Sequence, residues 1–145
     1  SLASFLHGKT PVIYCAAQYE GVAIRFRQQL NENSKMLCWH HVFPEMNHNE
    51  LVGWRKKDDS LAIFIFRDLD DYVKTSQRID ICKDVFKKYT PNIHEVWCKG
   101  DSFISKAIYF IHLGDWVSYF LAQKNEVDAM EIDVINMLKT ELGKN

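Results

Sequence analysis

Two continuous apolar runs, at residues 11–17 and 61–66, constrain the fold of this chain more than any other feature. Their sequences are PVIYCAA and LAIFIF, and neither contains a charged or amide side chain. A strand buried on both faces reads as such a run, whereas a strand with one wet face alternates apolar and polar side chains. Both runs are therefore predicted to be inner strands of a parallel sheet that helices cover on both sides.

Helical patterns alternate with these runs and with two further strand-like segments, residues 36–43 and 92–99. The first helix is expected at residues 19–33, with Val22 and Phe26 on its apolar face. Alternation of strands and helices implies parallel pairing through right-handed crossovers. We therefore expect an α/β fold: a three-layer α/β/α sandwich, flavodoxin-like and doubly wound, with a parallel sheet of four or five strands.

Three more helices are expected in the second half of the chain. One follows residue 68, and its apolar stripe reads Leu69, Tyr72, Ser76, Ile79, Lys83 and Phe86. The last is expected at residues 128–143. Between them, residues 102–120 form a helix that is apolar on almost every side. In one domain of this size, that excess of apolar surface predicts a partner, either a second subunit or another part of a longer chain.

Length and composition restrict the classes of function. A chain of 145 residues with 47% hydrophobic residues can form one domain with a substantial core. A formal net charge of −1 with interspersed charges argues against nucleic acid or an anionic membrane as a partner. The sequence has no long apolar span and no signal-peptide pattern. Its four widely spaced cysteines favour a reducing compartment, so we expect a cytoplasmic protein. The missing initial Met suggests a fragment excised from a longer protein.

A polar loop and the helix end before it carry the residues suited to acid–base chemistry. The strand-like segment ends at Pro44, and the loop Glu45-Met46-Asn47-His48-Asn49-Glu50 follows it. Ligands of open α/β sheets bind just outside the carboxyl ends of the strands. Glu32 lies at the end of the first helix, where the helix dipole disfavours a carboxylate. Either Glu32 or Glu45 could take a proton from carbon, and His48 could move one between oxygens.

Each of these residues also has a purely structural interpretation. Glu32 could be a solvated carboxylate at a helix end. Asn47 and Asn49 could satisfy their own backbone as an Asx-type turn. In the last helix, Lys139 shares the apolar stripe and would either reach the rim of the domain or approach a ligand, with Lys106 as the rival candidate.

Four segments together resemble a known enzyme family. LNEN and PEMNHNELVGW, preceded by GKTPVIY and followed by HLGDWVS, resemble the C-terminal half of the bifunctional phosphoglucose/phosphomannose isomerases. Those enzymes are built from two sugar-isomerase (SIS) domains. The resemblance covers nearly the whole chain, so residues 1–145 are interpreted as a single SIS domain, the C-terminal half of a two-domain isomerase.

The resemblance implies a reaction and a site. The reaction is the interconversion of glucose 6-phosphate or mannose 6-phosphate with fructose 6-phosphate, through ring opening and a cis-enediol, without cofactor or metal. Glu32 corresponds to the base and His48 to the ring-opening histidine, with Lys139 assisting. Asn47, Asn49 and Glu45 are expected to bind substrate.

The resemblance also implies partners. The family supplies the ring-opening histidine across a subunit contact, so a homodimer is expected. Most of its phosphate-binding hydroxyls lie in the N-terminal SIS domain, which is absent here, so this chain alone is expected to be inactive.

Two other functions are compatible with the sequence. The first is a non-catalytic SIS module that binds a phosphosugar and regulates another protein, since such modules share the fold. Retention of both Glu32 and His48 favours catalysis, because a sensor needs neither group. The second is a metal-dependent sugar isomerase using His40, His41 and His48. Neighbouring residues in a strand point to opposite faces, which argues against His40 and His41 sharing one ion.

Overall fold

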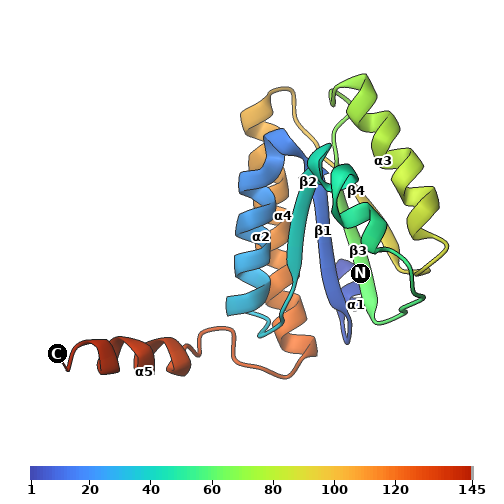
Figure 1. Cartoon of the computed structure of the whole chain (residues 1–145). Coiled ribbons are helices and arrows are strands. Elements are labelled where there is room, and N and C mark those ends of the chain that lie inside the picture. Colours follow the sequence, from blue (N-terminus) through green and yellow to red (C-terminus); the bar gives the residue numbers. More distant parts are fainter. Residues whose placement is uncertain (145) are drawn as a thin grey trace.

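The computed structural model describes residues 1–144, and its centre is a four-stranded parallel sheet (Figure 1). The strands are β1 (Thr10–Ala16), β2 (Trp39–Phe43), β3 (Leu61–Arg67) and β4 (Ile93–Trp97). Their order is β2-β1-β3-β4, so the two continuous apolar runs occupy the two inner positions. The prediction of a parallel sheet with these two runs at its centre is confirmed.

Burial explains why the inner strands are continuously apolar. β1 pairs with β2 on one side and with β3 on the other, and its residues Val12 to Cys15 are fully buried. In β3, Ala62 to Phe66 are buried to nearly the same degree. A strand covered on both faces has no wet position for a polar side chain.

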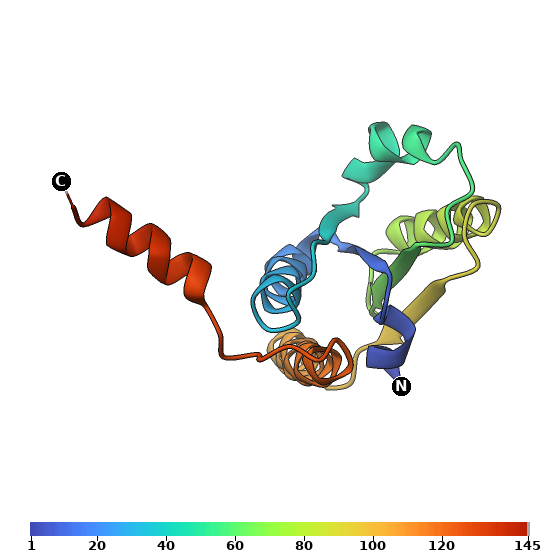
Figure 2. The same ribbon diagram turned by 90° about the horizontal axis from the view of Figure 1, so that it is seen from below.

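Helices cover both faces of the sheet, which confirms the three-layer sandwich. One face carries α1 (Leu2–Leu6), α2 (Glu20–Glu32) and α4 (Phe103–Lys124). The other carries α3 (Val73–Phe86) and two short 3₁₀ helices, η2 (Glu45–His48) and η3 (Glu50–Gly53). The view along the sheet separates the two layers clearly (Figure 2). A further short 3₁₀ helix, η1 (Ala17–Tyr19), joins β1 to α2.

Strand β2 and helix α3 begin later than the sequence predicts. β2 starts at Trp39, and continuing its register with β1 would place Cys38 opposite Pro11, which has no N–H to donate. α3 starts at Val73, so the expected stripe loses its first members: Leu69 and Tyr72 are 86% and 72% exposed. The buried residues of α3 are Ile79, Cys82 and Phe86.

Helix α4 packs closely against α2 and leaves one aromatic face exposed. A Cβ at Gly114 would lie 2.9 Å from Cδ2 of Phe26, so glycine allows the two helices to approach. On the outer side, Trp116 and Phe120 are stacked yet 49% and 48% exposed. No helix within residues 1–144 has the length and apolar character needed to cross a membrane.

Helix α5 (Asp133–Leu142) extends away from the sandwich (Figures 1 and 2). It is shorter than the expected 128–143, and none of its residues is buried. Its apolar side chains Val134, Ile135, Met137, Leu138 and Leu142 are exposed. The helix therefore contributes no core to the domain as it stands.

Candidate functional site

Glu32 is the last residue of α2 and is exposed. Its carboxylate makes no hydrogen bond or ion pair with any of residues 1–144. Beside it lies a depression of about 170 Å³ between the end of α2 and the start of α5. The lining residues are Asn31, Glu32, Lys35, Glu131, Ile132, Val134 and Ile135. A carboxylate with no partner at the rim of a hollow is free to act as a base.

Lys35 attaches the segment before α5 to this helix end. Its Nζ donates to the backbone oxygens of Glu32 and Glu131, each at 2.5 Å. These two bonds bring the chain leading into α5 alongside the end of α2. Lys139 lies further along α5 and is exposed. The two predicted active-site residues Glu32 and Lys139 are therefore on the same side of the domain.

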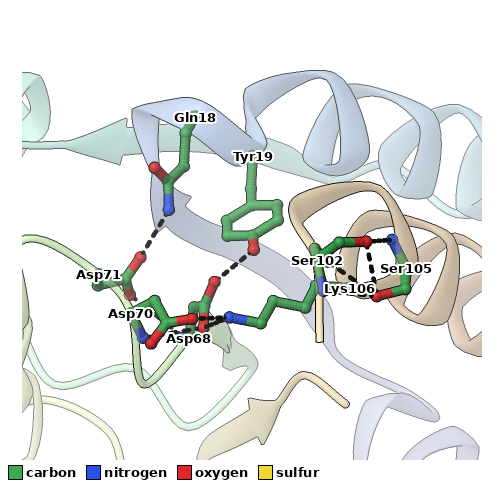
Figure 3. A network of polar contacts seen from close by, with 8 residues as sticks. All are labelled: Gln18, Tyr19, Asp68, Asp70, Asp71, Ser102, Ser105 and Lys106. Carbon is green, nitrogen blue, oxygen red and sulfur yellow. Dashed lines mark hydrogen bonds and ion pairs between the residues drawn. The ribbon is translucent and has the colours of Figure 1, made fainter. Parts of the chain in front are cut away.

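Lys106, the rival lysine, is engaged elsewhere. Its Nζ donates to Asp68 Oδ1 at 2.8 Å and also pairs with Asp70, at the end of β3 (Figure 3). Tyr19 Oη donates to the second oxygen of Asp68 at 2.5 Å. Burial alone would raise the pKa of Asp68, but hydrogen bonds from Lys106, Tyr19 and the Asp70 amide outweigh it and lower this pKa to about 2. Asp68 is thus ionised at neutral pH, and its charge holds the Lys106 ammonium at the end of β3.

The amides of the polar loop bind within the protein. Asn49 Oδ1 accepts from the Glu50 N–H at 2.6 Å and lies 3.1 Å from Nε2 of His41. Its Nδ2 donates to Glu45 Oε1 at 3.2 Å. Asn47 Nδ2 donates to Cys82 Sγ at 2.9 Å, in the layer between the loop and α3. These contacts fix the loop, and the predicted role of Asn47, Asn49 and Glu45 in binding substrate stays a prediction.

His48 is held out into solvent by this fixed loop. It is the last residue of η2, is exposed, and has no side-chain hydrogen bond with any residue the structure describes. Met46, two residues earlier, is fully buried. The loop therefore has a fixed inner side and presents an unengaged imidazole on its outer side.

Glu50 belongs to the same loop but was not among the site residues predicted from the sequence. One of its carboxylate oxygens accepts from the buried Tyr14 hydroxyl and from Trp39 Nε1, the latter at 3.1 Å. Trp54 Nε1 donates in turn to the Tyr14 oxygen at 3.2 Å. The sequence feature that could have pointed to Glu50 is its position directly after Asn47-His48-Asn49.

Glu32 and His48 lie at opposite ends of β2 and on opposite faces of the sheet. α2 ends before β2 begins, whereas η2 follows the end of β2. α2 lies on the face of the sheet that also carries α1 and α4, and η2 lies with α3 on the other face (Figure 2). β2 alone spans about 13 Å at roughly 3.3 Å per residue. The length of β2 therefore separates the two residues within one chain.

The histidines of β2 do not converge. His41 Nδ1 accepts from the Val42 N–H at 2.8 Å, so its Nε2 carries the hydrogen that is donated to Asn49. His40 has its Nε2 3.9 Å from Glu20, and burial lowers its pKa from the ordinary value. In residues 1–144 no three His, Cys, Asp or Glu side chains form a group that could hold a metal ion.

Comparison with known proteins decides the family. A family described as "Bacterial phospho-glucose isomerase C-terminal SIS domain" matches residues 1–142. The chain belongs to this family. This SIS domain is similar over almost its whole length to proteins named bifunctional phosphoglucose/phosphomannose isomerase. The resemblance inferred from LNEN and PEMNHNELVGW is confirmed.

Two relatives illustrate the similarity. The protein of that name from Aquifex aeolicus is 31% identical over 99% of this SIS domain, and this stretch is 46% of the relative. The one from Thermoplasma acidophilum is 35% identical over 93% of the domain and 43% of its own length. The chain thus spans less than half the length of these relatives.

A solved structure shares the fold. The glucose-6-phosphate isomerase like protein from Thermus thermophilus superposes with a TM-score of 0.70 at 18% identity. The match covers 88% of this SIS domain and 41% of that chain. At this level of identity the likeness concerns the arrangement of the sheet and helices.

Proposed function

We propose that this SIS domain is the C-terminal half of a two-domain phosphoglucose/phosphomannose isomerase. The proposed reaction interconverts glucose 6-phosphate or mannose 6-phosphate with fructose 6-phosphate. It needs no cofactor, because one base can carry the proton between C1 and C2 through a cis-enediol. Family membership and the two unengaged acid–base groups support this proposal. A regulatory module that only binds phosphosugar would need neither group.

Glu32 is the proposed base. Its exposed carboxylate removes the proton from C2 of the open-chain aldose and returns it to C1 of the enediol. The depression of about 170 Å³ beside it offers room for part of a sugar. A carboxylate that reaches C2 in either configuration explains how one site could accept both the glucose and the mannose epimer.

His48 is the proposed ring-opening group. Ring opening moves a proton from the anomeric hydroxyl to the ring oxygen, and an imidazole accepts and donates protons near neutral pH. Lys139 assists by placing a positive charge near a sugar oxygen or the phosphate. Glu45 and Asn49 are exposed in the same loop and would approach substrate at its edge, whereas the Asn47 side chain, also assigned to substrate binding, faces Cys82.

The separation of Glu32 from His48 carries the proposal that the site is composite. A single chain places them at opposite ends of β2, so one substrate must meet Glu32 of one subunit and His48 of another. A symmetric dimer would then form two equivalent sites. We propose the cytoplasm as its location, since all four cysteines are free and would stay reduced there.

The companion half of the protein is the proposed source of the phosphate site. The exposed aromatic face of α4 and the uncovered apolar side of α5 suit contact with another folded unit. Phosphate binding far from the reacting carbons would supply the energy that positions C1 and C2. We therefore expect the 145-residue chain to fold but not to isomerise glucose 6-phosphate, and activity to return when the companion half is added.

The test of the base is Glu32→Gln in the two-domain protein. The amide keeps the shape and loses the basicity, so exchange of the C2 hydrogen with solvent should fall on the order of 10²-fold to 10⁴-fold. Binding of sugar phosphate should persist. Asp84→Asn on the outer face of α3 is the matched carboxylate-to-amide control. Exchange at the wild-type rate in Glu32→Gln would refute the assignment, and binding without turnover in the unaltered protein would favour the regulatory module.

A further inference from the structure

Glu50 links the polar loop to the centre of the sheet. Its side chain is half-buried, and one oxygen accepts hydrogen bonds from Tyr14 and Trp39. Tyr14 lies in the inner strand β1, and Trp39 begins the edge strand β2. The carboxylate therefore bridges the loop to two adjacent strands at once.

Tyr14, one of the two donors that Glu50 meets, is held by several contacts in the core. Tyr14 is fully buried, stacks on Phe86 with ring centroids 5.3 Å apart, and receives the indole N–H of Trp54. Burial first, and then the charge of Glu50, raise the pKa of Tyr14 above its ordinary value. The phenol thus keeps its proton as a hydrogen-bond donor at all working pH values.

We propose that Glu50 is a positioning residue that fixes His48 for ring opening. The inference rests on the proposed function, in which His48 transfers the proton. The His48 side chain has no hydrogen bond or ion pair among the described residues, so its place depends on the chain on either side. On one side, buried Met46 anchors η2. On the other, the backbone of Asn49 and Glu50 is held by the Glu50 carboxylate.

The chemistry of the contact distinguishes positioning from catalysis. Glu50 acts here as a hydrogen-bond acceptor, and one oxygen takes both bonds. A glutamine retains such an oxygen, whereas an alanine does not. A residue that itself transferred a proton would lose its function in both variants.

The experiment compares Glu50→Gln and Glu50→Ala in the two-domain protein. One substrate is glucose 6-phosphate, and the other is a shorter aldose phosphate that cannot close a ring. We expect Glu50→Ala to lower kcat on the cyclic sugar on the order of 10-fold to 100-fold, since misplacing a group by about 1 Å has effects of this size. Turnover of the open-chain substrate should be unchanged. Glu50→Gln should stay within a few-fold of wild type on both, like the control Asp84→Asn.

A double-mutant cycle with His48→Ala completes the test. If Glu50 acts through His48, Glu50→Ala should cause no further loss once the imidazole is absent. If the losses of activity in Glu50→Ala and His48→Ala add up in the double variant, the inference is wrong but the proposed function stands. The same holds if Glu50→Gln loses as much activity as Glu50→Ala. A His48→Ala protein that turns over the cyclic sugar normally would overturn both. Should Glu50→Ala fail to fold, Trp39→Phe removes one of the two bonds and should give a smaller loss that is confined to the cyclic sugar.

Discussion

Mixing two inactive variants should restore activity if Glu32 and His48 of different subunits share a site. The variants are Glu32→Gln, which keeps the imidazole, and His48→Ala, which keeps the base. In a mixed dimer, one site receives both altered residues and the other receives both intact ones. The structural basis is the length of β2, about 13 Å, which separates the two groups within a chain.

The expected size of the recovery follows from the symmetry. Random pairing of equal amounts gives about half mixed dimers, and each has one complete site of two, so about one quarter of wild-type activity should return. The assay is formation of fructose 6-phosphate from glucose 6-phosphate after the variants are co-expressed or exchanged. A mixture of Glu32→Gln with the Glu32→Gln/His48→Ala double variant has no complete site and should remain inactive. Activity that never exceeds the sum of the separate variants would refute the composite site.

Three further predictions concern the domain itself. Gly114→Ala should lower the free energy of unfolding, measured in urea, by about 1 kcal/mol. Overpacking against Phe26 costs about 1–3 kcal/mol, and the higher helix propensity of alanine offsets only about 1 kcal/mol of it. A more stable variant would show that the Phe26 side chain moves aside. The pKa of Asp68 is lowered from 3.8 to about 2, so its charge stabilises the fold above pH 3.8, and the free energy of unfolding should fall as the pH drops from 3.8 towards 2. In Asp68→Asn, the free energy of unfolding should depend less on pH in this range. The double substitution Trp116→Ser/Phe120→Ser should change the thermal midpoint of unfolding little but weaken the affinity for the companion half, which calorimetry can measure. An unchanged affinity would mean that the companion half contacts another surface.

The two inner strands were predictable because their residues have to meet only one requirement, namely to be apolar. Residues 11–16 and 62–66 are buried, and burial on both faces explains why all of them are apolar, whereas Ala17 at the end of the first run is exposed. The start of β2 was harder to predict, because Cys38 is as apolar as its neighbours and its exclusion from the strand depends on Pro11 in β1. Leu69 and Tyr72 fit a helical stripe by spacing, yet the chain enters α3 only at Val73, so they are exposed on the connection.

The sequence could nominate candidate residues for the site but not their geometry. Glu32 and His48 are separated by few residues in sequence, which hides the fact that a strand intervenes and carries the loop to the other end and face of the sheet. Lys106 and Lys139 could not be ranked by sequence, because the partners of Lys106 come from the distant loop after β3. The link from Glu50 to Tyr14 joins residues 36 positions apart and has no local signature.

Helix α5 contributes no buried residue, so the stability of the sandwich does not depend on it. A protease that cuts the connection at residues 125–132 would release this helix while the rest of the domain stays folded. The rate of that cut measures how often α5 is undocked, since a docked helix would shield the connection. Limited proteolysis can thus report assembly of the complete protein without any substrate.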